Sequence, residues 1–446
     1  MTLMPYQQQG VDWLRSRPRS LLGDEQGLGK TAQAVTAIRD SPLGTVVVCP
    51  ATLKSNWARE LAMWSGIKPI VLDGRESWRF PKPGEAIILN YEILPDWLYQ
   101  TEQIGTKQKP KERWINPAVA LMRGWIKKYP LNLVLDEVHY CKNPDTERTR
   151  KATALSLCVT GCVIGMTGTP LANKPGDLFG VLDTLGLTDE FGFRHLSGWR
   201  TWWGGHWHQW GRRKPEWQWN CVVPTDCASR LKRVMLRRMK RDVLTQLPSK
   251  RYFNRYVDLP YSLHRQLDAE CGTKIKNLVP GEMPQFNEFS AARSAIAAAK
   301  IPAMMEFIEE YEDAGEPLCV YSANKAPIVA LGKRPGWAVI TGDVPHAVRQ
   351  KNVDDFQAGR LKGIGFTVAG AAGITLTNAS TMLEVSADWT PGTNSQAHDR
   401  IHRIGQSKDV RVFRLVANHP LDEHVYETLD MKQGVITAAI DAARRV

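Results

Sequence analysis

A glycine-rich segment near the start of the chain carries the residues best suited to chemistry. Residues 21–31 read L-L-G-D-E-Q-G-L-G-K-T, and a helix-forming run follows. Gly27 and Gly29 let the backbone curl tightly, so that its N–H groups can converge on an anion. A helix beginning near Lys30 adds its positive end, and the lysine amine and the Thr31 hydroxyl suit phosphates and Mg²⁺. The segment therefore predicts a phosphate loop that binds a nucleotide.

One position of this loop departs from the usual pattern. The strict motif has glycine six residues before the lysine, where this chain has Asp24. We still expect Asp24 and Leu28 to lie in the nucleotide site, although a glycine-rich turn capping an ordinary helix is the alternative. Upstream, the paired donor and acceptor of Gln7 could read an adenine edge, whereas the alternative is a surface glutamine.

Two adjacent carboxylates provide a second chemical element. The apolar run 131–135 predicts a buried strand, and Asp136 and Glu137 follow at its end. Asp136 could hold Mg²⁺ through water, and Glu137 could orient and polarise the attacking water. Thr167, in the turn T-G-T-P after a further apolar run, could sense the γ-phosphate. These residues predict ATP hydrolysis, whereas a surface acidic cluster is the alternative.

A third element lies near the end of the chain. Arg400 and Arg403 are three residues apart, so on a helix they would share one face. Two guanidinium groups on one face suit a triphosphate approached across a cleft, where such a finger can raise turnover by about 10³–10⁵. A salt-bridged surface helix is the alternative.

Apolar runs of strand length alternate with helical stretches in two parts of the chain. The expected strands are 45–49, 70–72, 86–89, 131–135 and 163–166 in the first part and 318–321, 337–341, 364–367 and 382–385 in the second. Such nearly continuous apolar strands indicate parallel sheets covered on both faces. We therefore expect an α/β fold with two doubly wound lobes, at 1–190 and 301–446, separated by an insertion and linker helices at 191–300. The second lobe has no Gly-Lys-Thr, so one nucleotide site would serve both.

The region between the predicted sheets concentrates positive charge and tryptophan. The chain has a net charge of +12, and residues 199–255 carry +11 of it, with fourteen Lys/Arg against three Asp/Glu. Seven of the sixteen tryptophans lie within 199–219, beside Arg212, Arg213 and Lys214. Cationic and aromatic contact with nucleic acid is one interpretation, and a small core of stacked indoles is the other.

Two further expectations concern the same region. Residues 230–251 predict one amphipathic basic helix that ends near Pro248 and contacts phosphates or the second lobe, with a solvated linker helix as the alternative. A zinc site is conceivable, although the spacing fits no common pattern, from His206, His208, Cys221 and Cys227.

Composition is that of a globular protein. Of the 446 residues, 43% are hydrophobic and 23% charged, and no apolar run approaches the length of a membrane span. The N-terminus lacks the pattern of a secretory signal, and the eight cysteines include no C-x-x-C pair. We expect an intracellular, DNA-associated protein with reduced thiols and no membrane partner.

Short motifs follow one another along the chain: P-Y-Q at Pro5, D-E-Q-G-L-G-K-T at Asp24, V-V-V-C-P at Val46, D-E-V-H at Asp136, T-G-T-P at Thr167, L-R-R-M-K-R-D-V at Leu236, A-G-A-A-G-I-T-L at Ala369 and Q-A-H-D-R-I-H-R-I-G-Q at Gln396. Taken together, these segments resemble the Swi/Snf-type ATPases of the superfamily-two helicases. The basic stretch ending in L-P-S-K, with the Trp-rich stretch before it, is most similar to the HepA-related annealing-helicase branch.

The resemblance implies two RecA-like lobes that hold ATP and Mg²⁺ between them. It places Lys54, Asn56 and Trp57 against the tracked DNA strand in the first lobe, and the turn 370–377 against it in the second. It also implies that Gly373 and Gln396 lie beside the nucleotide.

The resulting hypothesis is a DNA-dependent ATPase that translocates along duplex DNA, remodelling or annealing it. We expect a monomer directed by an unidentified targeting protein. A strand-separating DNA or RNA helicase on the same engine is one alternative. An ATP-binding DNA scaffold that does not hydrolyse is another, and a small-molecule P-loop kinase is a third.

Overall fold

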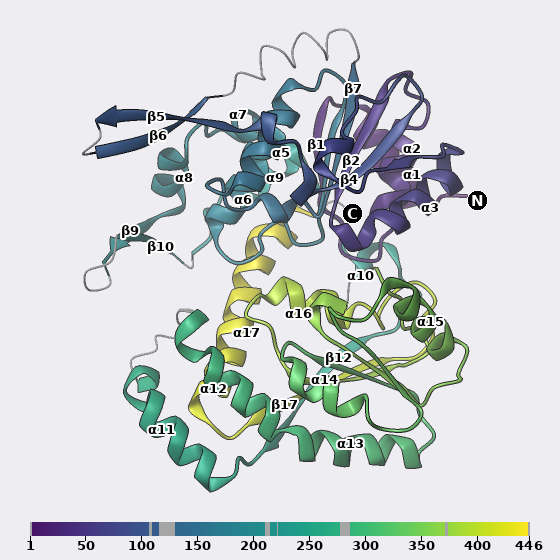
Figure 1. The fold of residues 1–446 in the computed structure, drawn as a ribbon, viewed down its shortest axis with the longest axis vertical. Helices are drawn as coiled ribbons and strands as arrows, with labels where there is room; N and C mark the ends of the chain where they lie inside the picture. Colours follow the sequence, from purple (N-terminus) through teal and green to yellow (C-terminus); the bar gives the residue numbers. More distant parts are fainter. Residues whose placement is uncertain are drawn as a thin grey trace. The chain divides into compact units, whose positions relative to one another are not determined.

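The computed structural model describes residues 2–106, 109–115, 130–209, 215–220, 222–276, 286–370 and 373–444. The chain forms two compact units (Figure 1). Unit 1 consists of Met1–Val243 and Val435–Val446, and unit 2 of Leu244–Gly434. The chain therefore passes from unit 1 to unit 2 and returns. The predicted insertion and linker region, 191–300, contributes residues to both.

Unit 1 contains a parallel sheet in the order β11-β1-β8-β7-β2-β4-β3. Alternate residues of one strand enter two different apolar clusters, because Val46 and Val48 face one and Val47 and Cys49 face the other. This burial on both faces explains the continuous apolar runs. The strands are β1 (Arg19–Leu22), β2 (Gly44–Cys49), β3 (Ile70–Val71), β4 (Ala86–Asn90), β7 (Leu131–Asp136), β8 (Val163–Met166) and β11 (Met235–Leu236).

Helices cover both faces of this sheet. In Figure 1, α1 (Pro5–Arg15), α2 (Lys30–Ile38) and α3 (Lys54–Ser65) lie on the opposite side of the strands from α5 (Glu147–Cys158) and α6 (Pro175–Leu185). The remaining elements of unit 1 are the hairpin β5 (Gln100–Thr106) and β6 (Lys109–Ile115), α7 (Thr188–Phe191), α8 (Leu196–Trp203), the hairpin β9 (Gly205–His208) and β10 (Glu216–Trp219), α9 (Cys227–Val234) and α10 (Lys240–Val243).

The single basic helix predicted over 230–251 is wrong. The segment instead divides into α9, β11, α10 and the start of β12 (Lys250–Val257). Met235 and Leu236 pair in parallel with Leu21 and Leu22 of β1, so their apolar side chains are buried by a strand rather than by one helix face. The helical spacing of the apolar residues was therefore misleading here.

The Trp-rich stretch contains both helix and hairpin. Trp199 and Trp203 are buried, and Trp202 packs against Trp199 with ring centroids 5.1 Å apart, which fits the interpretation as a small aromatic core. In the hairpin, Trp207 is 57% exposed and packs on Trp217. The predicted DNA contacts of the connecting turn lie outside the described residues, namely Arg212, Arg213 and Lys214.

Unit 2 contains a parallel sheet in the order β12-β17-β16-β13-β15-β14, again covered on both faces. Its further strands are β13 (Leu318–Ser322), β14 (Trp337–Ile340), β15 (Gly363–Phe366), β16 (Thr381–Ser386) and β17 (Val410–Ala417). Its helices are α11 (Tyr261–Lys276), α12 (Phe286–Ala299), α13 (Ile301–Asp313), α14 (Lys325–Leu331), α15 (His346–Gln357), α16 (Pro391–His398) and α17 (Pro420–Ile440). The predicted α/β class with two parallel-sheet lobes is confirmed.

Short 3₁₀ helices complete the described elements: η1 (Ala51–Leu53), η2 (Arg75–Ser77), η3 (Tyr91–Ile93), η4 (Asp96–Leu98), η5 (Val138–Cys141), η6 (Val368–Gly370) and η7 (Asp441–Ala443). Within the described ranges, no helix combines the length and the apolar character needed to cross a bilayer.

Candidate functional site

The predicted phosphate loop connects β1 to α2. Gly27 and Gly29 have φ angles of 83° and 72°, in the left-handed region that favours glycine. A Cβ on Gly29 would lie 2.4 Å from Nε2 of Gln7, so a side chain at this position would also displace its neighbour. The loop leads directly into α2 at Lys30, so its backbone has the compact geometry of an anion-binding turn.

Lys30 bends back over this loop. Its Nζ donates to the carbonyl oxygens of Asp24 (2.9 Å) and Glu25 (3.4 Å). Loss of solvent lowers the pKa of the amine, while the nearby carboxylates of Glu137, Asp24 and Asp136 favour its charged form. The amine is thus held within the loop, opposite the carboxylates that end β7.

Helix α1 brings two polar side chains to the same loop. Nε2 of Gln7 and the hydroxyl of Tyr6 both donate to the carbonyl oxygen of Leu28, at 3.3 Å and 3.2 Å. Oε1 of Gln7 accepts from the backbone N–H of Met4 at 2.9 Å. Burial and the charge of Asp24 raise the pKa of Tyr6 to about 12, so its hydroxyl stays protonated and donates. Gln7 therefore borders the loop, as its predicted adenine contact requires.

The carboxylate pair lies at the carboxyl end of β7. Asp136 is 7% exposed, its Oδ2 accepts from the Trp57 indole N–H at 2.7 Å, and its Oδ1 accepts from the backbone N–H of Glu137 at 2.9 Å. Burial, and then the charge of Glu137, raise the pKa of Asp136 to about 7. Glu137 has φ 48°, the one positive value of a non-glycine residue among those described. Such a backbone is uncommon outside glycine and is often found at functional sites.

The carboxylates are linked to the T-G-T-P turn. Nδ1 of His139 lies 3.2 Å from Oε2 of Glu137 and 3.0 Å from Oγ1 of Thr167. In the same turn, a Cβ on Gly168 would lie 2.4 Å from Cγ of Gln26 in the phosphate loop. Because β1, β8 and β7 are neighbours in the sheet, the phosphate loop, the T-G-T-P turn and the carboxylates meet at one edge.

The sequence analysis missed two arginines that hold this edge together. Nη1 of Arg237 donates to the carbonyl oxygens of Gly23 (2.7 Å) and Gly168 (2.9 Å), and its Nη2 pairs with Asp441 at 2.9 Å. Arg238 pairs with Asp24 through both oxygens, with Nε to Oδ1 at 3.0 Å. The two arginines directly follow the apolar pair Met235 and Leu236, which could have indicated a buried strand end. The many basic residues around them favoured an exposed helix instead.

Asp24 is therefore part of the support of the loop. It is completely buried, and its carboxylate also accepts from Nε2 of Gln33 at 3.2 Å. Its carboxylate is turned inward to Arg238, and the expectation that Asp24 lies in the nucleotide site stays a prediction. An acid in place of the usual glycine requires a buried counter-charge, and Arg238 supplies it.

The predicted DNA contacts of α3 differ in exposure. Trp57 is completely buried and donates to Asp136, which argues against a DNA contact by its side chain, and that contact stays a prediction. Nζ of Lys54 donates to Oδ1 of Asp73 at 2.9 Å, and Oδ1 of Asn56 accepts from Arg59 at 2.8 Å. DNA contacts by Lys54 and Asn56 remain predictions.

The two predicted finger arginines lie in unit 2, after the end of α16. The expected helix stops at His398, so Arg400 and Arg403 do not share a helix face. Their Nη1 atoms nevertheless approach a common acceptor, the carbonyl oxygen of Ile374, at 3.5 Å and 3.3 Å. The predicted nucleotide contact Gly373 precedes this acceptor, with φ 76°. Gln396, half-buried, lies in α16 itself.

The residues of unit 1 fit a magnesium-bound nucleotide. The loop offers converging N–H groups and the Lys30 amine, while the Thr31 hydroxyl and the Asp136 carboxylate are the hard oxygen donors that Mg²⁺ prefers. Nε2 of Gln26, in the loop, is buried without a hydrogen-bond partner among the described residues. Such an unpaired donor beside the loop suits a phosphate or ribose oxygen.

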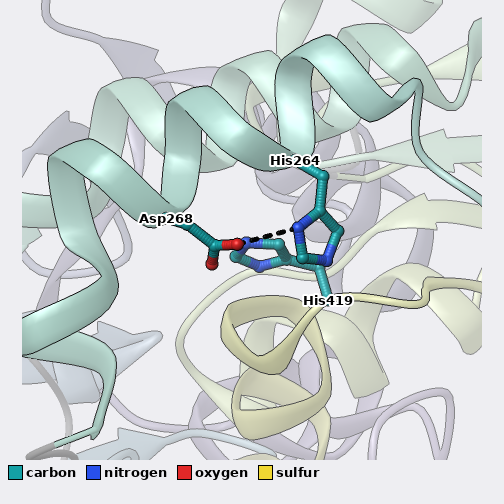
Figure 2. A group of neighbouring side chains, drawn as sticks. All are labelled: His264, Asp268 and His419. Carbon is teal, nitrogen blue, oxygen red and sulfur yellow. Dashed lines mark hydrogen bonds and ion pairs between the residues drawn. The ribbon is translucent and has the colours of Figure 1, made fainter.

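A second group of potential metal ligands lies in unit 2, where His264, Asp268 and His419 bring ligand atoms within 4.8 Å of one another (Figure 2). Nδ1 of His264 lies 3.0 Å from Oδ2 of Asp268. The backbone N–H of Leu421 donates to Nδ1 of the buried His419, so the neutral ring carries its proton on Nε2. If Nε2 bound a metal, the ring proton would move to Nδ1, where it would face the backbone N–H of Leu421. The histidine therefore fits a cap of α17 better than a metal ligand.

The conceivable zinc site receives no support from its described members. Cys227 is completely buried in the apolar core of unit 1, which raises the pKa of its thiol to about 12. His206 and His208 lie on β9, and Cys221 lies outside the described residues.

Two protein-family models match this chain. The model of the SNF2-related domain matches residues 6–268, and that of the helicase conserved C-terminal domain matches residues 300–405. Similar curated proteins include "ISWI chromatin-remodeling complex ATPase ISW1" of Saccharomyces cerevisiae, 27% identical over 96% of this chain and 40% of the relative. Another is "SWI/SNF-related matrix-associated actin-dependent regulator of chromatin subfamily A-like protein 1 homolog" of Caenorhabditis elegans, 30% identical over 97% of this chain and 61% of the relative.

A third is "DNA annealing helicase and endonuclease ZRANB3" of Mus musculus, 25% identical over 99% of this chain and 41% of the relative. The chain thus spans less than two thirds of the length of each of these relatives. Among solved structures, the Sulfolobus solfataricus SWI2/SNF2 ATPase core in complex with dsDNA is 21% identical, with a TM-score of 0.43, over 99% of this chain and 93% of the other. Because the SNF2-related model alone matches more than half of its residues, the chain belongs to the SNF2-related family, and it also contains the helicase conserved C-terminal domain.

Proposed function

We propose that the chain is a DNA-dependent ATPase that uses hydrolysis to translocate along duplex DNA. The observation that carries the proposal is the edge at which β1, β8 and β7 end. A lysine-bearing phosphate loop, a threonine turn and a buried carboxylate pair meet there. This set of groups is suited to phosphoryl transfer to water.

In this proposal the residues of unit 1 bind the nucleotide and orient the attacking water. The loop N–H groups and Lys30 hold the phosphates, and Gln7 borders the base. Thr31 and Asp136 would hold Mg²⁺, which when bound neutralises charge on the phosphates. Glu137 orients a water molecule and accepts its proton. His139, in contact with both Glu137 and Thr167, links the base to the turn that faces the terminal phosphate.

Unit 2 supplies positive charge to the same reaction. Arg400 and Arg403 are brought together at the Ile374 carbonyl, so the segment can present two guanidinium groups at once. Contacts between these arginines and the γ-phosphate would form with the triphosphate and be lost with the diphosphate. They would therefore favour one conformational state only while the triphosphate is bound, as a motor requires. Gly373 and Gln396 belong to the same proposed surface.

Duplex DNA is the proposed track. Relatives are named as a chromatin-remodeling ATPase and as a DNA annealing helicase, and the segment 199–255 of this chain carries a net charge of +11. Positive charge concentrated in one segment favours a polyanion. We accordingly propose a DNA-associated location, a monomeric motor, and a separate targeting protein that directs it.

The test compares ATP hydrolysis with matched duplex, single-stranded and forked DNA and with RNA. We expect duplex to stimulate the rate, and Lys30→Ala and Glu137→Gln to abolish that stimulation. A rate that ignores duplex would contradict the proposal. A fluorescent strand-displacement assay separates the alternatives: efficient unwinding of a blunt-flanked duplex favours the strand-separating helicase, and ATP binding without any hydrolysis favours the scaffold.

A further inference from the structure

The linker, defined here as residues 237–250, joins unit 1 to unit 2 and is bonded to the phosphate loop where it begins. The backbone N–H of Gly23 donates to the Leu236 carbonyl oxygen (2.8 Å), and that of Glu25 donates to the Arg238 carbonyl oxygen (2.9 Å). With the buried contacts of the Arg237 and Arg238 side chains, these bonds make the start of the linker part of the loop's own framework.

The end of the linker is bonded to the segment that carries the two arginines. Nζ of Lys250 pairs with Oδ1 of Asp399 at 2.9 Å, and Nε2 of His402 lies 2.8 Å from the carbonyl oxygen of Pro248. Asp399 and His402 each directly precede one of the arginines in the sequence. The linker thus holds the arginine segment from both sides of Arg400.

We propose that Lys250 is a positioning residue for Arg400 and Arg403, and that the linker connects the phosphate loop to them as one short tether. The inference rests on the proposed function, because it takes the arginines to act on the nucleotide. Nine residues, 239–247, separate the two anchored ends. Their fully extended length is at most about 30 Å, and α10 shortens it further. A tether with so little slack restricts how far the arginines can move from the loop.

Because the Lys250–Asp399 ion pair is largely buried, loss of its charge should disturb the contact between the linker and the arginine segment. The Asp399 side chain is only 3% exposed and that of Lys250 is 16% exposed. Without the ammonium group, the Asp399 carboxylate would remain inside the protein beside fewer positive charges. The turn that begins at Asp399 then has to shift or take up a proton. Either change moves Arg400, the next residue, without removing any group that touches the nucleotide.

Lys250→Met tests the inference, because methionine retains most of the side-chain length without the charge. We expect duplex-stimulated kcat to fall roughly ten- to a hundredfold, as for a small misplacement of catalytic groups. The KM for ATP and the affinity for duplex should stay within about twofold, since the binding groups of unit 1 are unchanged. Lys250→Arg should restore most of the rate. Lys325→Met, which breaks the exposed ion pair with Asp343 in the same unit, is the matched control and should behave as wild type.

A second readout does not depend on activity. Hydrogen exchange of the nucleotide-free protein should be faster at residues 399–406 in Lys250→Met than in Lys325→Met. If Lys250→Met does not fold, the isosteric Asp399→Asn takes its place. Wild-type kcat in the folded variant, or unchanged exchange at 399–406, overturns the inference. If wild type itself shows no duplex-stimulated hydrolysis, the proposed function fails instead, and the exchange experiment still decides whether Lys250 anchors the segment.

Discussion

Asp136 is buried beside a second carboxylate, and this has a measurable consequence for stability. Its pKa is raised from 3.8 to about 7. Between these values the folded protein binds a proton that the unfolded chain releases. The resulting stabilisation is present below about pH 4 and is lost as pH rises through 7. Ionisation of Asp136 therefore lowers the free energy of unfolding of the nucleotide-free protein at neutral and alkaline pH.

Asp136→Asn removes this cost, because asparagine cannot ionise and still offers an oxygen to Trp57. We expect the nucleotide-free variant to be more stable than wild type, with an advantage that grows by about 2.5 kcal/mol between pH 5 and pH 8. Urea unfolding at the two pH values measures it, and Asp343→Asn at an exposed site is the control. An advantage that is the same at both pH values would show that Asp136 does not titrate in this range.

Single residues with local patterns could be predicted from the sequence. The loop residues Gly27, Gly29 and Lys30 are close in sequence, and their types alone favour an anion-binding turn. The carboxylates Asp136 and Glu137 follow an apolar strand in the same direct way. Arg238 could not be predicted, because its partner Asp24 lies 214 positions earlier and only the folded sheet brings the two together. Long-range ion pairs of this kind leave no periodic signal.

Among the elements, α3 differs most between the role predicted from the sequence and the role that its contacts indicate. The family resemblance implied a DNA contact through Trp57, but the helix packs this side chain inward, where the indole supports the metal-binding carboxylate proposed above. Lys54 on the same helix remains compatible with a DNA contact. The failure over 230–251 has a related cause, because burial by pairing with β1 outweighed the helical pattern.

Trp57→Phe separates the two interpretations of α3. Phenylalanine keeps most of the apolar volume and removes the N–H that Asp136 accepts, so we expect duplex-stimulated kcat to fall roughly tenfold, for a hydrogen bond of about 1.5 kcal/mol. Duplex affinity should stay within about twofold, because the side chain is buried. Trp64→Phe, which loses a bond to Glu60 on the same helix, is the control. A variant with normal kcat and weakened duplex binding would support the DNA contact instead.

The last segment of the chain, Val435–Val446, belongs to unit 1, and no local sequence pattern predicted this. The core of unit 1 includes Ile436, Ala439, Ile440 and Ala443, although the rest of that unit ends at Val243. Asp441 is also buried there and pairs with Arg237. The end of the chain therefore completes the unit that carries the phosphate loop. The sequence predicted two parallel-sheet lobes but assigned this last segment to the second lobe.

Ile440→Ala tests whether this last segment belongs to the fold of unit 1. Ile440 is completely buried, so we expect the free energy of unfolding of unit 1 to fall by about 2–5 kcal/mol. Fourteen of the sixteen tryptophans lie before residue 244, so tryptophan fluorescence during urea unfolding reports mainly on this unit. Met431→Ala, in the same helix at a side chain that is 44% exposed, should have little effect because exposed apolar groups contribute little to stability. Equal losses in the two variants, or a fluorescence transition unchanged by Ile440→Ala, would mean that the segment does not stabilise unit 1.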